Sequence, residues 1–189
     1  MHTLAVMATI PAPLSFTVRL FGAAALDPEA YEDVEADPGA TGQALLVVVL
    51  SSLAAGIGSR TPGHTSVLNI LWISGISVVA WAAWALVTYE IGSRLMPEPD
   101  TRVDVGELLR TIGFASAPGL IRVLGVLPGV AVPVFAVSAV WMLAANVVAV
   151  RQALDYTSTK RALAVCGLGW ALAIGLALAL GLSFGPAVS

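Results

Sequence analysis

The chain has 189 residues, of which 58% are hydrophobic and only 11% are charged. A soluble domain carries roughly 45–50% apolar and about 25% charged residues, so a water-soluble fold would expose too much apolar surface. The formal net charge is −3 with only 9 basic residues, which excludes the basic face that a nucleic-acid partner requires. We therefore expect an all-α integral membrane protein whose first partner is the lipid bilayer.

Residues 1–43 form a predicted N-terminal cytoplasmic or interfacial segment. The apolar residues around Arg19 favour a stretch that lies at the membrane surface. Asp27-Pro28-Glu29 is typical of a helix start, because aspartate caps the first turn and proline suits the first helical position. The predicted acidic helix ends near Asp37. Its acidic face is expected to stay in water or to contact a basic partner.

Five stretches that are almost free of charge follow within residues 44–189, the predicted transmembrane domain. A helix needs about 20 apolar residues to cross a bilayer. The second, fourth and fifth stretches meet this length, whereas the first and third are short. The predicted spans are residues 44–59, 67–91, 112–127, 130–150 and 162–182. Together they predict a five-transmembrane-helix bundle.

The third span is the least regular, because Pro118 interrupts its hydrogen-bond ladder and Pro128 closes it. A full crossing and a re-entrant segment shielded by other helices are both compatible with this pattern. Loop charges favour the full crossing. Five crossings place seven basic residues on one side of the membrane and one on the other, whereas a re-entrant third span would split them four against four.

The same count predicts that the N-terminus is cytoplasmic and the C-terminus lies outside, because basic loops stay inside. The seven basic residues are Arg19, Arg94, Arg102, Arg110, Arg151, Lys160 and Arg161. Eight of the nine basic residues are arginine, and alanine, glycine and valine abound. This composition suggests a GC-rich genome and hence a bacterial cytoplasmic membrane.

Three polar residues lie in or at the end of predicted spans. Ionisable groups are costly in a bilayer, so Arg122 in the third span and Glu90 at the end of the second are candidate site residues. Arg122 is expected to snorkel outward, to tether helices, or to bind a substrate or ion. The depths of Arg122 and Glu90 differ, so they are expected to pair only if the third span is displaced. Asn146 in the fourth span is a candidate for a hydrogen bond between helices.

The fifth span carries small residues every four positions, which lets helix backbones approach closely in lipid. They are expected to pack inside the bundle or to form a homodimer seam. This row consists of Gly167, Ala171, Gly175 and Ala179. The deep tryptophans, Trp81, Trp84 and Trp141, are expected to fill the bundle and to need partners for their N–H groups.

The sequence contains no GxSxG, HExxH or P-loop motif, and neither histidine lies inside a span. Its single cysteine, Cys166, excludes an internal disulfide and a cysteine metal cluster. We therefore expect no catalytic, cofactor-binding or metal-binding residues.

Several segments together resemble the Yip1 domain family over roughly Phe16 to Gly181. An acidic LDPEAYEDV helix precedes five spans, and Glu107–Pro118 (ELLRTIGFASAP) resembles the stretch that opens the family's third span. Val140-Trp141-Met142-Leu143 then leads to Arg151-Gln152-Ala153-Leu154, and Ser158–Ala162 opens the fifth span, as in bacterial members. The resemblance implies a five-helix bundle with a cytoplasmic N-terminus. Eukaryotic relatives act in vesicle traffic with Rab GTPases, but their motifs of the first two spans are absent here, so no functional residues are carried over.

The leading functional hypothesis is a non-catalytic scaffold or accessory subunit that packs against itself or a larger membrane complex. The alternative is a small channel or transporter with a polar site around Arg122 and Asn146. An intramembrane enzyme has the least support, because no nucleophile–base pair or metal constellation is visible.

Overall fold

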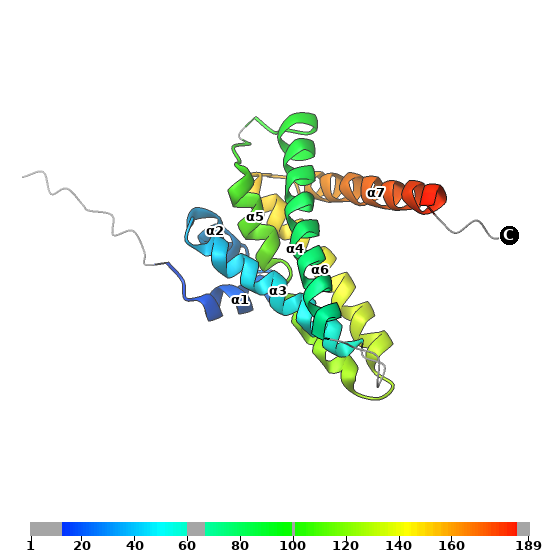
Figure 1. The fold of residues 1–189 in the computed structure, drawn as a ribbon. Helices are drawn as coiled ribbons and strands as arrows, with labels where there is room; N and C mark the ends of the chain where they lie inside the picture. The colour runs from blue at the N-terminus through cyan, green and yellow to red at the C-terminus, as the bar shows by residue number, and fades with distance from the viewer. Residues whose placement is uncertain (1–12, 60–66, 100, 185–189) are drawn as a thin grey trace, which may run out of the picture.

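The computed structural model describes residues 13–59, 67–99 and 101–184, and within these ranges all regular structure is helical (Figure 1). From residue 176 onward only the backbone is described. The elements in chain order are α1 (Phe16–Ala24), α2 (Pro28–Ala36), α3 (Ala40–Gly58), α4 (Val67–Glu90), the π-helical turn η1 (Ile91–Leu95), α5 (Val105–Phe114), the 3₁₀ helix η2 (Ala117–Val126), α6 (Ala131–Ala153) and α7 (Thr159–Phe184).

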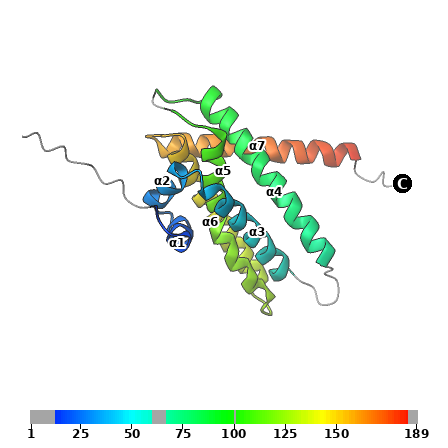
Figure 2. The ribbon, with the colours of Figure 1, turned by 60° about the vertical axis from the view of Figure 1, so that its left-hand side comes forward.

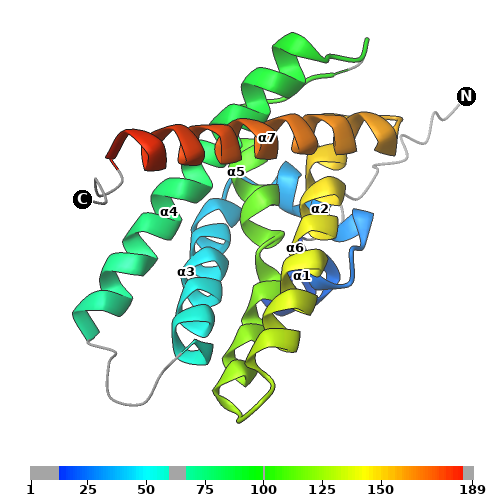
Figure 3. The same ribbon diagram turned by 90° about the vertical axis from the view of Figure 1, so that its right-hand side faces the viewer.

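Four stretches of the described chain are long and apolar enough to cross a bilayer. They are Ala40–Gly58, Ser74–Leu95, Val105–Val126 and Ala131–Ala153. The predicted number of five spans is therefore not confirmed. The predicted fifth span lies in α7, which runs across the other helices instead of alongside them (Figure 3).

The start of the third span differs from the prediction. A capping box begins α5 at Val105, because the side chain of Asp104 accepts from the Glu107 amide and the Glu107 side chain accepts from the Asp104 amide. Arg110 lies inside this helix, 6% exposed, and its guanidinium donates to the carbonyls of Val34 and Glu35 at the end of α2. The helix can continue through Arg110 because this charge is bonded inside the protein.

The third span packs tightly on α3 through small residues. After α5 ends at Phe114, the chain continues as η2, and glycines of this span contact small residues of α3 so closely that an added Cβ would overlap them. Within η2 the glycines are two 3₁₀ turns apart, while their α3 neighbours are about two α-helical turns apart, so both rows stay on one face. The contacting pairs are Gly113 with Ala44, Gly119 with Ser51, and Gly125 with Gly58.

The N-terminal helices lie against the ends of α5 and α6 (Figure 2). Asp27 caps α2 as predicted, since its Oδ1 accepts from the Glu29 amide at 3.1 Å. Tyr31 and Val34 of α2 are fully buried in a core shared with α3, α5 and α6. On α1 the usual pattern is reversed: Arg19 is buried, whereas Phe21 is 73% exposed. An exposed apolar face is consistent with the predicted interfacial position of this segment.

A second core joins α4, α5, α6 and the start of α7. The hydroxyl of Tyr156, in the loop after α6, lies within hydrogen-bond distance of the carbonyls of Gly92 (2.9 Å) and Met96 (2.8 Å). These carbonyls belong to the π turn η1 and the residue after it, where the regular helical bonding changes. Tyr156 thus fixes the loop that leads into α7 to the end of α4.

Candidate functional site

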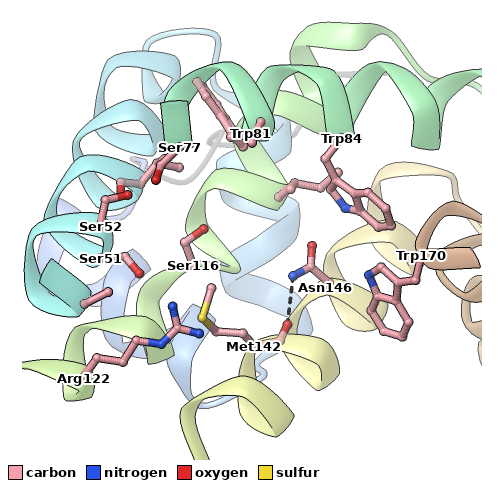
Figure 4. A pocket seen from close by; sticks show the side chains of 14 residues that line it. Ser51, Ser52, Ser77, Trp81, Trp84, Ser116, Arg122, Met142, Asn146 and Trp170 are labelled. Atoms are coloured by element: carbon pink, nitrogen blue, oxygen red, sulfur yellow. Dashed lines mark hydrogen bonds between the residues drawn. The ribbon is translucent and has the colours of Figure 1, made fainter. Parts of the chain in front are cut away.

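A cavity of about 360 Å³ lies between α3, α4, the third span, α6 and the start of α7. It brings together Arg122 and Asn146, two polar residues that the sequence singled out from different spans (Figure 4). The cavity is mixed in character, with serine hydroxyls on one side and tryptophan rings on the other. Its lining also includes Ser51, Ser52, Ser77, Trp81, Trp84, Ser116, Met142 and Trp170.

Arg122 tethers η2 to α6. Its Nε donates to the Ser138 hydroxyl at 2.9 Å, and its guanidinium carbon lies 5.7 Å from the centre of the Phe135 ring. Ser138 is fully buried, and its hydroxyl lies 3.5 Å from the Pro118 carbonyl, to which it donates. The guanidinium also lines the cavity, so Arg122 can both tether the helices and contact a bound ligand.

Glu90 is not part of this site. Its carboxylate pairs with Arg94 at 3.0 Å, one helical turn along, and both side chains are more than half exposed. Such exposed pairs contribute about 0.3–0.5 kcal/mol. In the described residues no carboxylate lies within ion-pair distance of Arg122.

Asn146 lies at the other side of the cavity and bonds within its own helix. Its Nδ2 donates to the Met142 carbonyl at 2.9 Å, so the side-chain amide does not make the predicted bond to a neighbouring helix. Its Oδ1 is buried and has no hydrogen-bond partner in the described chain. A buried acceptor of this kind is uncommon and costs about 1–3 kcal/mol.

Two of the deep tryptophans, Trp81 and Trp84, are partly buried in the bundle, whereas Trp141 is 36% exposed. The indole N–H of Trp81 donates to the Leu109 carbonyl at 3.1 Å, and that of Trp141 donates to the Ala24 carbonyl at 2.7 Å. Trp84 stacks on Trp170 of α7 with ring centroids 6.2 Å apart. The stacked rings of Trp84 and Trp170 close the apolar end of the cavity.

Comparison with known protein families identifies the Yip1 domain, which matches residues 7–180 and so nearly the whole chain. The chain belongs to the Yip1 domain family. Comparisons with curated proteins and with solved structures gave no match. Within this Yip1 domain, the segment Glu107–Pro118 forms the greater part of α5 and the start of η2. Family membership and the apolar helices together show an integral membrane protein.

In this Yip1 domain the small-residue row of α7 is exposed as far as its side chains are described. Gly167, Ala171 and Gly175 are all exposed, and no atom lies within 4 Å of an added Cβ at Gly167 or Gly175. The side chain of Ala179 lies outside the described residues. On the opposite side of α7, Gly169 is buried against the Trp84 ring.

A second polar cluster of the Yip1 domain, which sequence reasoning missed, lies at the end where α2 meets α5 and α6. Arg19 is 1% exposed and pairs with Asp33 at 2.6 Å and with Asp37 at 2.9 Å. Contact with this guanidinium holds the pKa of Asp37 below its ordinary value. The basic partner of the acidic helix, Arg19, thus lies within the chain. In the sequence, only the position of this arginine among apolar residues pointed to it.

Beside this cluster, Glu35 lines a cavity of about 400 Å³ together with Glu32, Glu107 and Asp155. Burial and the neighbouring carboxylates of Asp155 and Glu107 raise the pKa of Glu35 to about 7. In the part of the chain that the structure describes, no group of three His, Cys, Asp or Glu residues is placed to hold a metal ion.

Proposed function

We propose that this Yip1 domain is a non-catalytic scaffold or accessory subunit that packs in the membrane against a second copy or a larger complex. The supporting observation is the open row of Gly167, Ala171 and Gly175 on α7. Small residues let two helix backbones approach closely, which is a main source of helix association in lipid. Among the described side chains of α7, those that belong to the core lie between Ala162 and Trp170, and the row from Ala171 to Gly175 is exposed and can meet another helix.

Cysteine cross-linking in native membranes tests this proposal. The parent variant is Cys166→Ala, which removes the single natural thiol. In that background Ala171→Cys places a thiol in the small-residue row, and Leu172→Cys places one about 100° around the same helix. Oxidation should give a dimer, or an adduct with a partner, for Ala171→Cys and much less for Leu172→Cys. Equal cross-linking of both variants, or none with either, contradicts the scaffold role.

A small channel or transporter is the second candidate function. It is favoured by the cavity, which joins Arg122 and Asn146 although the two residues come from different spans. Flux of ions and small solutes into proteoliposomes tests this candidate, with Arg122→Ala as the comparison. Flux that depends on Arg122 supports it, and flux no greater than that of empty liposomes retires it.

We further propose that α7 is a fifth membrane span in a bacterial cytoplasmic membrane, with the N-terminus inside and the C-terminus outside. The seven-to-one distribution of basic residues supports this topology. Reporter fusions test it: alkaline phosphatase, which is active only outside, should be active when fused after residue 189. Green fluorescent protein, which folds only inside, should fluoresce when fused after Asp155. The reverse pattern contradicts the topology.

A further inference from the structure

Arg122 places a positive charge in a predicted membrane span, and no described residue supplies a counter-charge. No described residue that lines its cavity is acidic. A cation at this depth is costly unless anionic or polar groups stabilise it. The Ser138 hydroxyl and the Phe135 ring supply part of that stabilisation. An anion bound in the cavity would supply the remainder.

The hydrogen-bonding capacity of the cavity is also only partly used. A guanidinium carries five N–H donors, and among the described residues only the Nε of Arg122 has a partner. Figure 4 shows the other two nitrogens directed toward the cavity, below Ser116 and beside Met142. Farther along, the buried Oδ1 of Asn146 receives no hydrogen bond from the part of the chain that the structure describes. A ligand that carries both an anionic group and a hydrogen-bond donor matches this arrangement.

The size and the far end of the cavity define the remainder of the ligand. Its volume of about 360 Å³ is at the small end of the range for ligand pockets, roughly 300–1,000 Å³. Beyond Asn146 the wall is formed by the stacked rings of Trp84 and Trp170 (Figure 4). A small anionic group with an apolar extension therefore fits better than a purely inorganic ion.

We propose that the cavity binds an amphiphilic anion, with a phosphate or carboxylate at Arg122, a donor group at Asn146, and an apolar part along Trp84. The ligand is either the headgroup region of a membrane lipid or a soluble organic anion. This inference is independent of the scaffold role, and it deepens the second candidate function by naming its ligand class. Binding without flux upholds the inference and retires the transporter.

The test uses the full chain in nanodiscs of neutral phosphatidylcholine. In one arm phosphatidylglycerol, which carries a phosphate and hydroxyl donors, is added and bound lipid is counted by native mass spectrometry. In the other arm a soluble hydroxylated octanoate, 3-hydroxyoctanoate, which carries a carboxylate and a hydroxyl donor, is added and its binding is measured by calorimetry. Arg122→Gln should weaken binding roughly tenfold or more, as expected for loss of a charged hydrogen bond. Arg94→Gln, which removes an exposed arginine in η1, is the matched control and should bind like the wild type.

Ser138→Ala separates ligand binding from helix tethering, because it removes the Arg122 tether and keeps the charge. This variant should retain binding. Binding in the lipid arm identifies a lipid as the source of the ligand, and binding in the hydroxyoctanoate arm identifies a soluble anion. The inference is overturned if the wild type binds in neither arm, if Arg122→Gln binds as well as the wild type, or if Ser138→Ala loses as much binding as Arg122→Gln.

Discussion

Arg19 shows how a single charged side chain can organise a whole segment of this protein. It is 1% exposed, pairs with Asp33 and Asp37, and donates to the Gln43 side chain at 3.2 Å. These contacts join α1, the acidic helix α2 and the start of α3. Removing one member of a buried ion pair leaves the remaining charges uncompensated. Breaking the pair therefore costs more free energy of folding than the intact pair contributes.

Arg19→Met should lower the free energy of unfolding by about 2–3 kcal/mol, somewhat less than for a fully buried pair because the two aspartates are partly exposed. Unfolding in mixed detergent micelles, followed by circular dichroism, measures the change. Arg94→Met is the control and should stay within about 0.5 kcal/mol of the wild type, because its pair with Glu90 is exposed. Equal effects of the two variants would show that Arg19 does not stabilise the fold.

Glu35 should make stability depend on pH. Its pKa is raised from 4.5 to about 7 in the folded chain, mainly by burial and then by Asp155. The folded state therefore binds this proton more tightly than the unfolded state does. The stabilisation is complete below pH 4.5, decreases as the pH rises, and is lost above about 7.

Glu35→Gln should flatten this slope and be more stable than the wild type at pH 8. Unfolding midpoints at pH 4.5, 6 and 8 measure the effect. Glu29→Gln, on the exposed side of the same helix, should keep the wild-type slope. An unchanged slope in Glu35→Gln would assign the pH dependence to other groups.

Contacts between residues that are close in the sequence could be predicted, whereas contacts between residues far apart in the sequence could not. The cap at Asp27 follows from neighbouring residues, and a deep indole N–H such as that of Trp81 must find an acceptor. The partner of Arg19 depends on how α1 folds back on α2, which no local pattern encodes. The meeting of Arg122 and Asn146 at one cavity likewise depends on the packing of η2 against α6.

Of the helix contacts that involve a described glycine, the contact between α3 and the third span is the closest. Gly119 and Gly125 let η2 approach α3 closely, and Gly58 of α3 lies directly against the Arg122 carbonyl. This contact also holds one wall of the cavity in place. A change in the spacing of these two helices would therefore move Arg122.

Gly58→Ala should destabilise the protein by about 1–3 kcal/mol, because the added methyl group overlaps the backbone carbonyl of Arg122. Gly56→Ala is the matched control on the same helix. Nothing lies within 4 Å of its added Cβ, and alanine favours the helix by up to about 1 kcal/mol. The contact is not tight if both variants unfold at the same detergent concentration as the wild type.

The helices themselves were predicted well where apolar runs are long, and less well at the third span. Pro118 marks an irregularity, which the structure shows as the 3₁₀ helix η2. The sequence predicts too late a start for the third span, because the charges of Glu107 and Arg110 are typical of a loop. Glu107 closes a local capping box with Asp104, whereas Arg110 is bonded to the end of α2, a contact that depends on the tertiary fold.

On the scale of the whole molecule, α1 and α2 belong to the same core as the membrane helices. The aromatic rings of Phe16 and Phe114 meet with centroids 6.2 Å apart, and the Tyr31 hydroxyl donates to the Ala23 carbonyl inside that core at 3.1 Å. The N-terminal helices therefore cover the ends of α5 and α6 instead of forming a detached domain.

A chain that begins at Ala40 should accumulate poorly or unfold at a clearly lower detergent concentration than the full chain. It loses Tyr31 and Val34 and uncovers Phe114, a loss of about 3 kcal/mol or more. A chain that begins at Leu14 keeps α1 and α2 and is the control. Wild-type stability of the shorter chain would contradict the shared core.

The 3₁₀ winding of η2 has a consequence for how the third span can reach across the bilayer. A 3₁₀ helix rises about 2.0 Å per residue against 1.5 Å for an α-helix. The ten residues of η2 thus cover about 20 Å where an α-helix would cover about 15 Å. Stretching the backbone in this way gives a glycine-rich apolar run a longer reach without additional residues. Rewinding it as an α-helix would pull the turn at Leu127–Val130 inward by about one helical turn.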